Sequence, residues 1–174
     1  MSADVNETPS AATAVATPRP WRAWGLALVV IVLDQLTKLW IVQGLHFVEG
    51  SSMPVLGPFR LTFVYNEGIS FGLFQGTGLG RWLLAAFQGT VSVALILWAR
   101  KVGRPWLLAG IGLVIGGAIG NLIDRVRLGR VIDFLDFSAI HFPWVFNVAD
   151  ASITVGVILI LATEIFTPRP KAAP

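Results

Sequence analysis

Cysteine is absent from the 174-residue chain, and histidine occurs only at His46 and His141. Without cysteine the chain can form no disulfide, no thiol nucleophile and no thiolate metal site. Two histidines without an H-E-x-x-H pattern also argue against a zinc site. We therefore expect a protein that uses neither a metal ion nor another cofactor.

Charged residues are scarce as well. They make up 13% of the chain, whereas hydrophobic residues make up 55%. A soluble domain usually has about a quarter charged residues, so this composition is typical of a protein in a lipid bilayer. The net charge is +3, and the basic residues lie at the edges of apolar segments. This placement argues against a nucleic-acid partner.

Four apolar segments are long enough to cross a bilayer, which takes about 20 mostly apolar residues. They cover approximately residues 24–42, 82–98, 106–123 and 148–166. We predict an all-α membrane protein in which residues 21–167 form one domain of four transmembrane helices. Residues 1–20 and 168–174 are expected to be polar tails, the first of them disordered.

Lysine and arginine indicate which way the helices cross the membrane. By parity, one set of segment ends carries Arg19, Arg22, Arg100, Lys101, Arg104, Arg169 and Lys171. The positive-inside rule predicts that this side, with both termini, is cytoplasmic. Three arginines on the other side, Arg125, Arg127 and Arg130, count against this orientation.

The two loops on the outer side contain residues typical of β-strands. Residues 55–65 are typical of a strand, and apolar and polar side chains alternate there after the Gly-Pro turn at residues 57–58. Shorter strand-like stretches occur at residues 131–132 and 144–146. We expect a small β platform on the outer side, resting on the membrane.

Polar residues gather at this same outer level. Asp124 and Asp133 follow the third segment, and Asp150 opens the fourth. Ionisable groups at this depth are costly and usually face a cavity or a partner. Two carboxylates that share a site hold one proton between them, and such a pair can act as base toward water and as acid toward a leaving group. Asp133 and Asp150 are the candidate pair, and Asp124 competes with them.

The same carboxylates allow other interpretations. They could bind ions in a transporter or a proton relay, or they could pair for structural reasons in a membrane scaffold. Asp34 and Lys38 are four residues apart on one helix face and could simply neutralise each other. Asp136 is expected to be a solvated loop charge. Residues 68–72 match G-x-S-x-G, but that pattern needs a strand-turn-helix elbow and a histidine partner.

Small and amide side chains also have two interpretations. Gly112, Gly116 and Gly120 predict a helix-packing face. Gly117 beside them could instead let a substrate backbone come close. Asn121 and Asn147 could serve only to tie helix ends to the loops.

Five polar stretches follow one another in an order that resembles a known family. They are residues 34–38 (Asp-Gln-Leu-Thr-Lys), 66–72 (Asn-Glu-Gly-Ile-Ser-Phe-Gly), 116–125 (Gly-Gly-Ala-Ile-Gly-Asn-Leu-Ile-Asp-Arg), 131–134 (Val-Ile-Asp-Phe) and 146–156 (Phe-Asn-Val-Ala-Asp-Ala-Ser-Ile-Thr-Val-Gly). On four spans, in this order, they resemble signal peptidase II, the bacterial lipoprotein signal peptidase family of aspartyl peptidases. That family removes the signal peptide of prolipoproteins, before a cysteine that already carries diacylglycerol.

The resemblance implies a role for each matching residue. It implies that Asp133 and Asp150 are catalytic and that Asp124 is structural, together with Arg125. The residues implied to line or support the site are Asn66, Gly117, Asn121, Arg125, Asn147, Asp34 and Lys38. It further implies a bacterial inner-membrane enzyme that acts near the periplasmic face on a lipid-modified prolipoprotein. We expect a monomer among membrane lipids, although the sequence does not determine the oligomeric state.

One stretch departs from the family pattern. The family usually reads Asn-Thr-Gly-Ala-Ala-Phe where this chain has Glu67 and Ile69 after Asn66. The retained asparagine keeps the implied role, whereas the extra carboxylate and the bulkier side chain are expected to alter local charge or substrate fit.

Overall fold

Four long apolar helices make up the body of the protein in a computed structural model that describes residues 17–68 and 79–166. They are α1 (Trp21–Leu39), α2 (Leu79–Ala99), α3 (Pro105–Leu128) and α4 (Val148–Phe166). A π-helical turn, η1 (Trp40–Gly44), extends α1. Each helix is long and apolar enough to cross a membrane, which confirms the four predicted spans. Most of both predicted tails, and residues 69–72 of the serine pattern, lie outside the described residues.

Helix α3 is the central helix of the bundle. It packs against α1, α2 and α4, and 67% of its most apolar window is buried, compared with 28% or less in the other three. Glycine allows this close packing. A Cβ atom at Gly112 would lie 2.6 Å from the Ala23 carbonyl oxygen, and one at Gly116 would lie 2.6 Å from Val30 Cβ. The predicted glycine face is therefore the surface on which α1 rests.

Gly117 has a similar structural place on the next face of α3. A Cβ atom there would collide with the Ala149 carbonyl oxygen and would come within 2.7 Å of Ile153. Its missing side chain lets α3 and α4 approach each other.

Helix α3 is longer than the apolar run predicts. It continues past Ile123 to Leu128 and ends where Gly129 adopts a left-handed φ of 79°. Apolarity marks only the part of a helix that faces lipid or core, whereas the stop is set by the glycine that follows the last turn. Asp124 and Arg125 therefore belong to the helix, where their backbone is held rigidly, and not to the loop after it.

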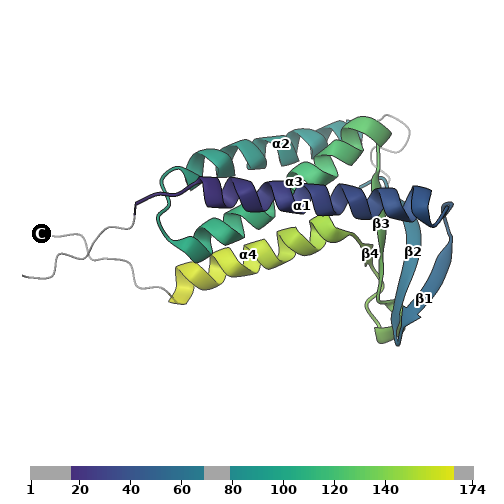
Figure 1. Cartoon of the computed structure of the whole chain (residues 1–174). Helices are drawn as coiled ribbons and strands as arrows, with labels where there is room; N and C mark the ends of the chain where they lie inside the picture. The colour runs from purple at the N-terminus through teal and green to yellow at the C-terminus, as the bar shows by residue number, and fades with distance from the viewer. Residues whose placement is uncertain (1–16, 69–78, 167–174) are drawn as a thin grey trace, which may run out of the picture.

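A four-stranded antiparallel sheet lies at one end of the bundle, as predicted for the two outer loops. Its strands are β1 (Ser52–Leu56), β2 (Phe59–Asn66), β3 (Val131–Asp136) and β4 (Val145–Phe146), in that order. Figure 1 shows the strands running across the helix axes, where α1 ends and α4 begins. The first turn of α1 and the last turn of α4 lie together at the opposite end. An apolar cluster joins η1 to the sheet, made of Ile41, Leu61, Phe63, Ile132 and Phe134.

The prediction that Asp136 is a solvated loop charge is wrong. Asp136 ends strand β3 and is only 6% exposed. Its carboxylate accepts hydrogen bonds from the Thr62 hydroxyl at 2.6 Å and from the Ser138 backbone N–H at 2.9 Å. The Thr62 bond, more than the others, holds the pKa of Asp136 below its usual range. Strand pairing brings Thr62 to Asp136, and this contact is not visible in the sequence.

The glycine contacts generate a stability prediction. Gly112→Ala should destabilise the bundle by about 1–3 kcal/mol, because the added methyl group forces α1 away from α3. Gly25→Ala is the matched control, since a Cβ atom at Gly25 on α1 meets nothing within 4 Å. Unfolding in mixed detergent micelles, followed by tryptophan fluorescence, measures both. Equal stability of the two variants would contradict close packing of α1 on α3 at Gly112.

Candidate active site

The start of α4 fixes the position of Asp150. Asn147 precedes the helix, and its Oδ1 accepts the Asp150 backbone N–H at 2.9 Å. In return, Asp150 Oδ2 accepts the Asn147 backbone N–H at 3.3 Å. This reciprocal pair has the form of a capping box, in which cap and third residue satisfy each other's backbone. The other oxygen of Asp150, Oδ1, accepts Asn121 Nδ2 of α3 at 2.7 Å.

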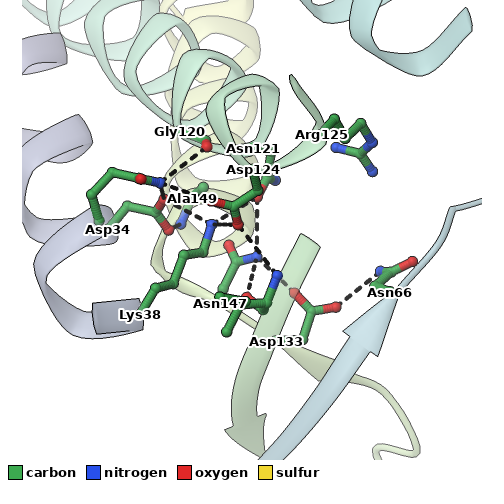
Figure 2. A network of polar contacts seen from close by, with 12 residues as sticks. Asp34, Lys38, Asn66, Gly120, Asn121, Asp124, Arg125, Asp133, Asn147 and Ala149 are labelled. Carbon is green, nitrogen blue, oxygen red and sulfur yellow. Dashed lines mark hydrogen bonds and ion pairs between the residues drawn. The ribbon is translucent and has the colours of Figure 1, made fainter. Parts of the chain in front are cut away.

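Asp133 reaches the same place from the sheet. It lies in the middle of β3 and is 2% exposed. Its Oδ1 accepts Asn147 Nδ2 at 2.7 Å, and its Oδ2 accepts Asn66 Nδ2 at 2.9 Å. Figure 2 shows Asp133 between these two asparagines, one from β2 and one from the start of α4. Neutral amides therefore hold the Asp133 carboxylate, and no charge from them offsets its own.

Two asparagines join the carboxylates. Asn147 Nδ2 donates to Asn121 Oδ1 at 3.1 Å as well as to Asp133, while Asn121 donates to Asp150. Both amides are buried. The structure thus brings Asp133 and Asp150 into one hydrogen-bonded group, and Asn121 and Asn147 do more than tie helix ends to loops.

Burial and proximity alter the acidity of Asp133. Loss of solvent is the larger cause, and the negative charge of Asp150 is the second. Together they raise the pKa of Asp133 to about 6. The hydrogen bonds from Asn66 and Asn147 act in the opposite direction, because they favour the ionised form. An aspartate with this pKa can carry a proton in mildly acidic conditions and release it near neutrality.

Lys38 lies at the centre of a second polar group next to the first. Its ammonium contacts Asp34 Oδ2 and Asp124 Oδ2, both at 2.8 Å, and Asn121 Oδ1 at 3.2 Å. Its three N–H donors therefore meet three acceptors. The predicted pairing of Asp34 with Lys38 is confirmed, and Figure 2 shows the lysine reaching from α1 into the centre of the network.

Asp34 and Asp124 each bond to a second element. Asp34 Oδ1 accepts the Ala149 backbone N–H at the start of α4, at 3.0 Å. Asp124 Oδ2 accepts the Ile132 backbone N–H of β3 at 3.2 Å. Both carboxylates thus link Lys38 to the backbone segments that carry Asp150 and Asp133.

We expected Asp124 to be structural together with Arg125, but Asp124 forms its ion pair with another residue. Successive residues of a helix point about 100° apart, so neighbours do not face each other. Asp124 points to α1 and Lys38, whereas Arg125 Nη1 donates to Gln88 Oε1 of α2 at 3.0 Å. Figure 2 shows Arg125 standing apart from the Lys38 group. Its Nε is buried and has no hydrogen-bond partner among the described residues.

Two glutamines of the polar network were not among the residues predicted for the site. Gln35 Nε2 contacts Asp34 Oδ2, Asp124 Oδ1 and the Gly120 carbonyl oxygen at 3.0–3.2 Å. Gln88 is the partner of Arg125. Each is the sole Asn or Gln in its apolar helix. An amide at membrane depth needs a polar partner, and this signal could have identified both residues.

The described part of the chain contains no group of three or more histidine or acidic side chains that could hold a metal ion. The carboxylate oxygens instead face amide, ammonium and backbone donors. The arrangement is suited to holding and transferring a proton beside a water molecule.

Comparison with known proteins identifies a family that the chain resembles. The family described as signal peptidase (SPase) II matches residues 26–166. A lipoprotein signal peptidase of Caulobacter vibrioides is 51% identical over 156 residues, which is 89% of this chain and 93% of that protein. One from Cupriavidus necator is 44% identical over 153 residues, covering 86% of this chain and 85% of that protein.

Solved structures of a bacterial membrane enzyme are also similar. One, determined at 2.3 Å resolution, has a TM-score of 0.72 and 28% identity, and the match covers 87% of this chain and 94% of that one. A second, at 1.9 Å, has a TM-score of 0.72 and 30% identity, covering 84% and 94%.

The Lys38 group generates a prediction about folding. Lys38→Met should destabilise the protein by about 3–5 kcal/mol, because Asp34 and Asp124 would lose the cation between them inside the bundle. The thermal transition in detergent, together with the yield of folded protein, measures the loss. Lys101→Met removes an exposed lysine from the loop before α3 and should leave the transition unchanged. A stable Lys38→Met protein would show that the ammonium is dispensable.

Proposed function

The chain belongs to the signal peptidase II family, and on this premise we propose that it removes signal peptides from diacylglyceryl-modified prolipoproteins, cutting before the lipidated cysteine. It is an aspartic peptidase of the signal peptidase II type. The observation that carries the proposal is the pair of aspartates, Asp133 and Asp150, joined by Asn121 and Asn147 at the end of a membrane-spanning bundle.

In the proposed reaction the two carboxylates share one proton and hold the attacking water. The ionised carboxylate takes a proton from the water as its oxygen bonds to the scissile carbonyl carbon. The protonated carboxyl then gives its proton to the leaving amine as the peptide bond breaks, so that the pair ends with one proton, as it began. A signal helix and lipid that displace water from the site would favour the neutral form of Asp133 further.

The surrounding residues support this pair in different ways. Asn66, Asn121 and Asn147 orient the carboxylates through hydrogen bonds. Lys38, Asp34 and Asp124 hold α1, α3, α4 and β3 in register. We propose that Arg125, whose Nε lacks a partner among the described residues, faces the substrate. Gly117 supports the site by bringing α3 against α4.

The arrangement of the helices indicates on which side of the membrane the reaction takes place. The site lies at the sheet end of the bundle, opposite the end where α1 begins and α4 finishes (Figure 1). Most basic flanking residues lie at that opposite end, so we propose that both termini are cytoplasmic and that the site faces the periplasm from the bacterial inner membrane. We propose that the protein acts as a monomer surrounded by membrane lipids.

A proton relay is the second candidate, and the distribution of charge disfavours it. A relay needs ionisable groups that continue to both membrane faces. The helices contain no Asp, Glu, Lys, Arg or His over residues 23–33, 82–99, 105–123 and 151–163. The gap separates the aspartates from Glu164, which pairs with Arg104 at the far end. A scaffold without chemistry would not need two carboxylates joined through two buried amides.

The departure at Glu67 leaves this proposal intact. Glu67 follows β2 in an exposed position, and the Gly68 backbone N–H bonds to Asn66 Oδ1 at 2.9 Å. Asn66 is therefore still held toward Asp133. Ile69 lies outside the described residues, and we propose that the two substitutions affect substrate preference and not the chemistry.

Removal of either carboxylate tests the reaction. Asp133→Asn and Asp150→Asn should each reduce cleavage of a diacylglyceryl-modified preprolipoprotein in detergent by at least about a hundredfold, because an amide cannot exchange the proton. The folded yield should be preserved. Asp136→Asn on the same strand is the control and should retain most activity, since an amide oxygen can still accept from Thr62. Near-normal turnover by both of the first two variants would rule out the pair.

The acidity of Asp133 generates a pH prediction. The Asn66 hydrogen bond favours ionised Asp133 and so lowers the pKa of that carboxyl. Asn66→Ala should raise this pKa, so the alkaline decline of kcat/KM should move to higher pH, by up to about one unit. Thr62→Ala, which loses a bond to Asp136 only, should leave the decline in place. A shift to lower pH would show that Asp133 is not the titrating acid.

A further inference from the structure

An uncharged, largely apolar lobe forms the tip of the sheet. It consists of residues 53–59, around the β1–β2 turn, and residues 137–146, from the end of β3 through β4. Neither stretch contains an Asp, Glu, Lys or Arg, and the single titratable side chain is His141. Arg60, just outside the lobe, bonds to the Ser52 hydroxyl on β1. We call these two stretches the aromatic lobe.

The aromatic lobe exposes large apolar side chains. The exposed fractions are 80% for Leu56, 66% for Trp144, 56% for Ile140, 50% for Val55 and 42% for Phe142. Apolar surface is costly to leave in water, and contiguous patches of this kind usually mark a contact with a protein or a membrane.

Ring contacts hold this surface in a defined shape. Phe137 stacks on Phe59 at 5.1 Å and on Phe146 at 5.9 Å between ring centroids. Phe142 meets the edges of Phe146 and Trp144 at 5.9 and 5.4 Å. The exposed side chains therefore rest on a layer of packed rings, and the surface is formed before any partner arrives.

The lobe lies at the level where the chain enters the membrane. Phe146 is only two residues before Val148, the first residue of α4. Figure 1 shows the tip of the sheet projecting sideways past the start of α4, because the strands run across the helix axes. A lobe in that position overhangs the lipid beside α4, whose outward side chains Val155, Ile158 and Leu161 are exposed.

We propose that the aromatic lobe inserts into the interfacial layer of the bilayer on the sheet side of the protein. Lipid is the partner that this surface fits. Tryptophan and other amphipathic rings prefer the interface, absence of charge lowers the cost of entering it, and the surface continues into the lipid-facing side of α4. Since the lobe joins β3 to α4, its insertion fixes the height of Asp133 relative to the membrane that holds Asp150. Insertion of the lobe does not depend on the proposed reaction.

The absence of native cysteine allows a direct test. Ala139→Cys places a nitroxide label in the lobe, and Glu49→Cys places one in the loop before β1, at a charged and exposed position. Both proteins are reconstituted into liposomes of phosphatidylethanolamine and phosphatidylglycerol. Collision of each label with oxygen, which is enriched in lipid, and with a water-soluble nickel chelate is then measured by power saturation.

The ratio of oxygen collisions to chelate collisions should be several-fold higher for the label in the lobe than for the label at position 49. Equal chelate access at both positions would place the lobe in water and overturn the proposal. Protection of the Ala139 label from both reagents would mean that protein covers the lobe, which would overturn it as well. Circular dichroism of each labelled variant verifies that the helices are intact.

Discussion

The buried ammonium group of Lys38 is the constraint on which the site depends. It lies 2.8 Å from two carboxylates, Asp34 on its own helix and Asp124 on α3. In hydrocarbon, an ammonium group or a carboxylate without a partner would be prohibitively costly. The three helices and the sheet must therefore meet so that all of these groups are satisfied together. The backbone bonds from Ala149 to Asp34 and from Ile132 to Asp124 extend this requirement to α4 and β3.

This arrangement separates two kinds of carboxylate that look alike in the sequence. Asp34 and Asp124 share one cation, Lys38, and each accepts a backbone N–H from another element. Asp133 and Asp150 receive hydrogen bonds from neutral amides, and the charge of Asp150 acts on Asp133. We propose that the second kind carries the shared proton of the reaction. The proposed separation of structural from catalytic aspartates therefore rests on their partners and not on the residue type.

The sheet contributes half of the site and, by the proposed insertion of the aromatic lobe, sets its height. Asp133 belongs to β3 and Asp150 to α4, and the link between them is the lobe itself. A substrate that carries a lipid next to its cleavage site would meet both carboxylates at the boundary between hydrocarbon and water. A rigid, membrane-docked sheet limits how far Asp133 can move from Asp150, which is a condition for sharing one proton.

The sequence by itself determined the four spans, the outer sheet and the level at which the polar residues gather, because apolar length, strand alternation and the cost of charge in lipid are local properties. It also paired Asp34 with Lys38, since four residues make one helical turn. The partners of Asp124, Arg125 and Asp136, and the roles of Gln35 and Gln88, were decided only by the tertiary structure. The contacts that decide these roles join segments that are far apart in the chain, and helix rotation and strand register choose which side chains meet.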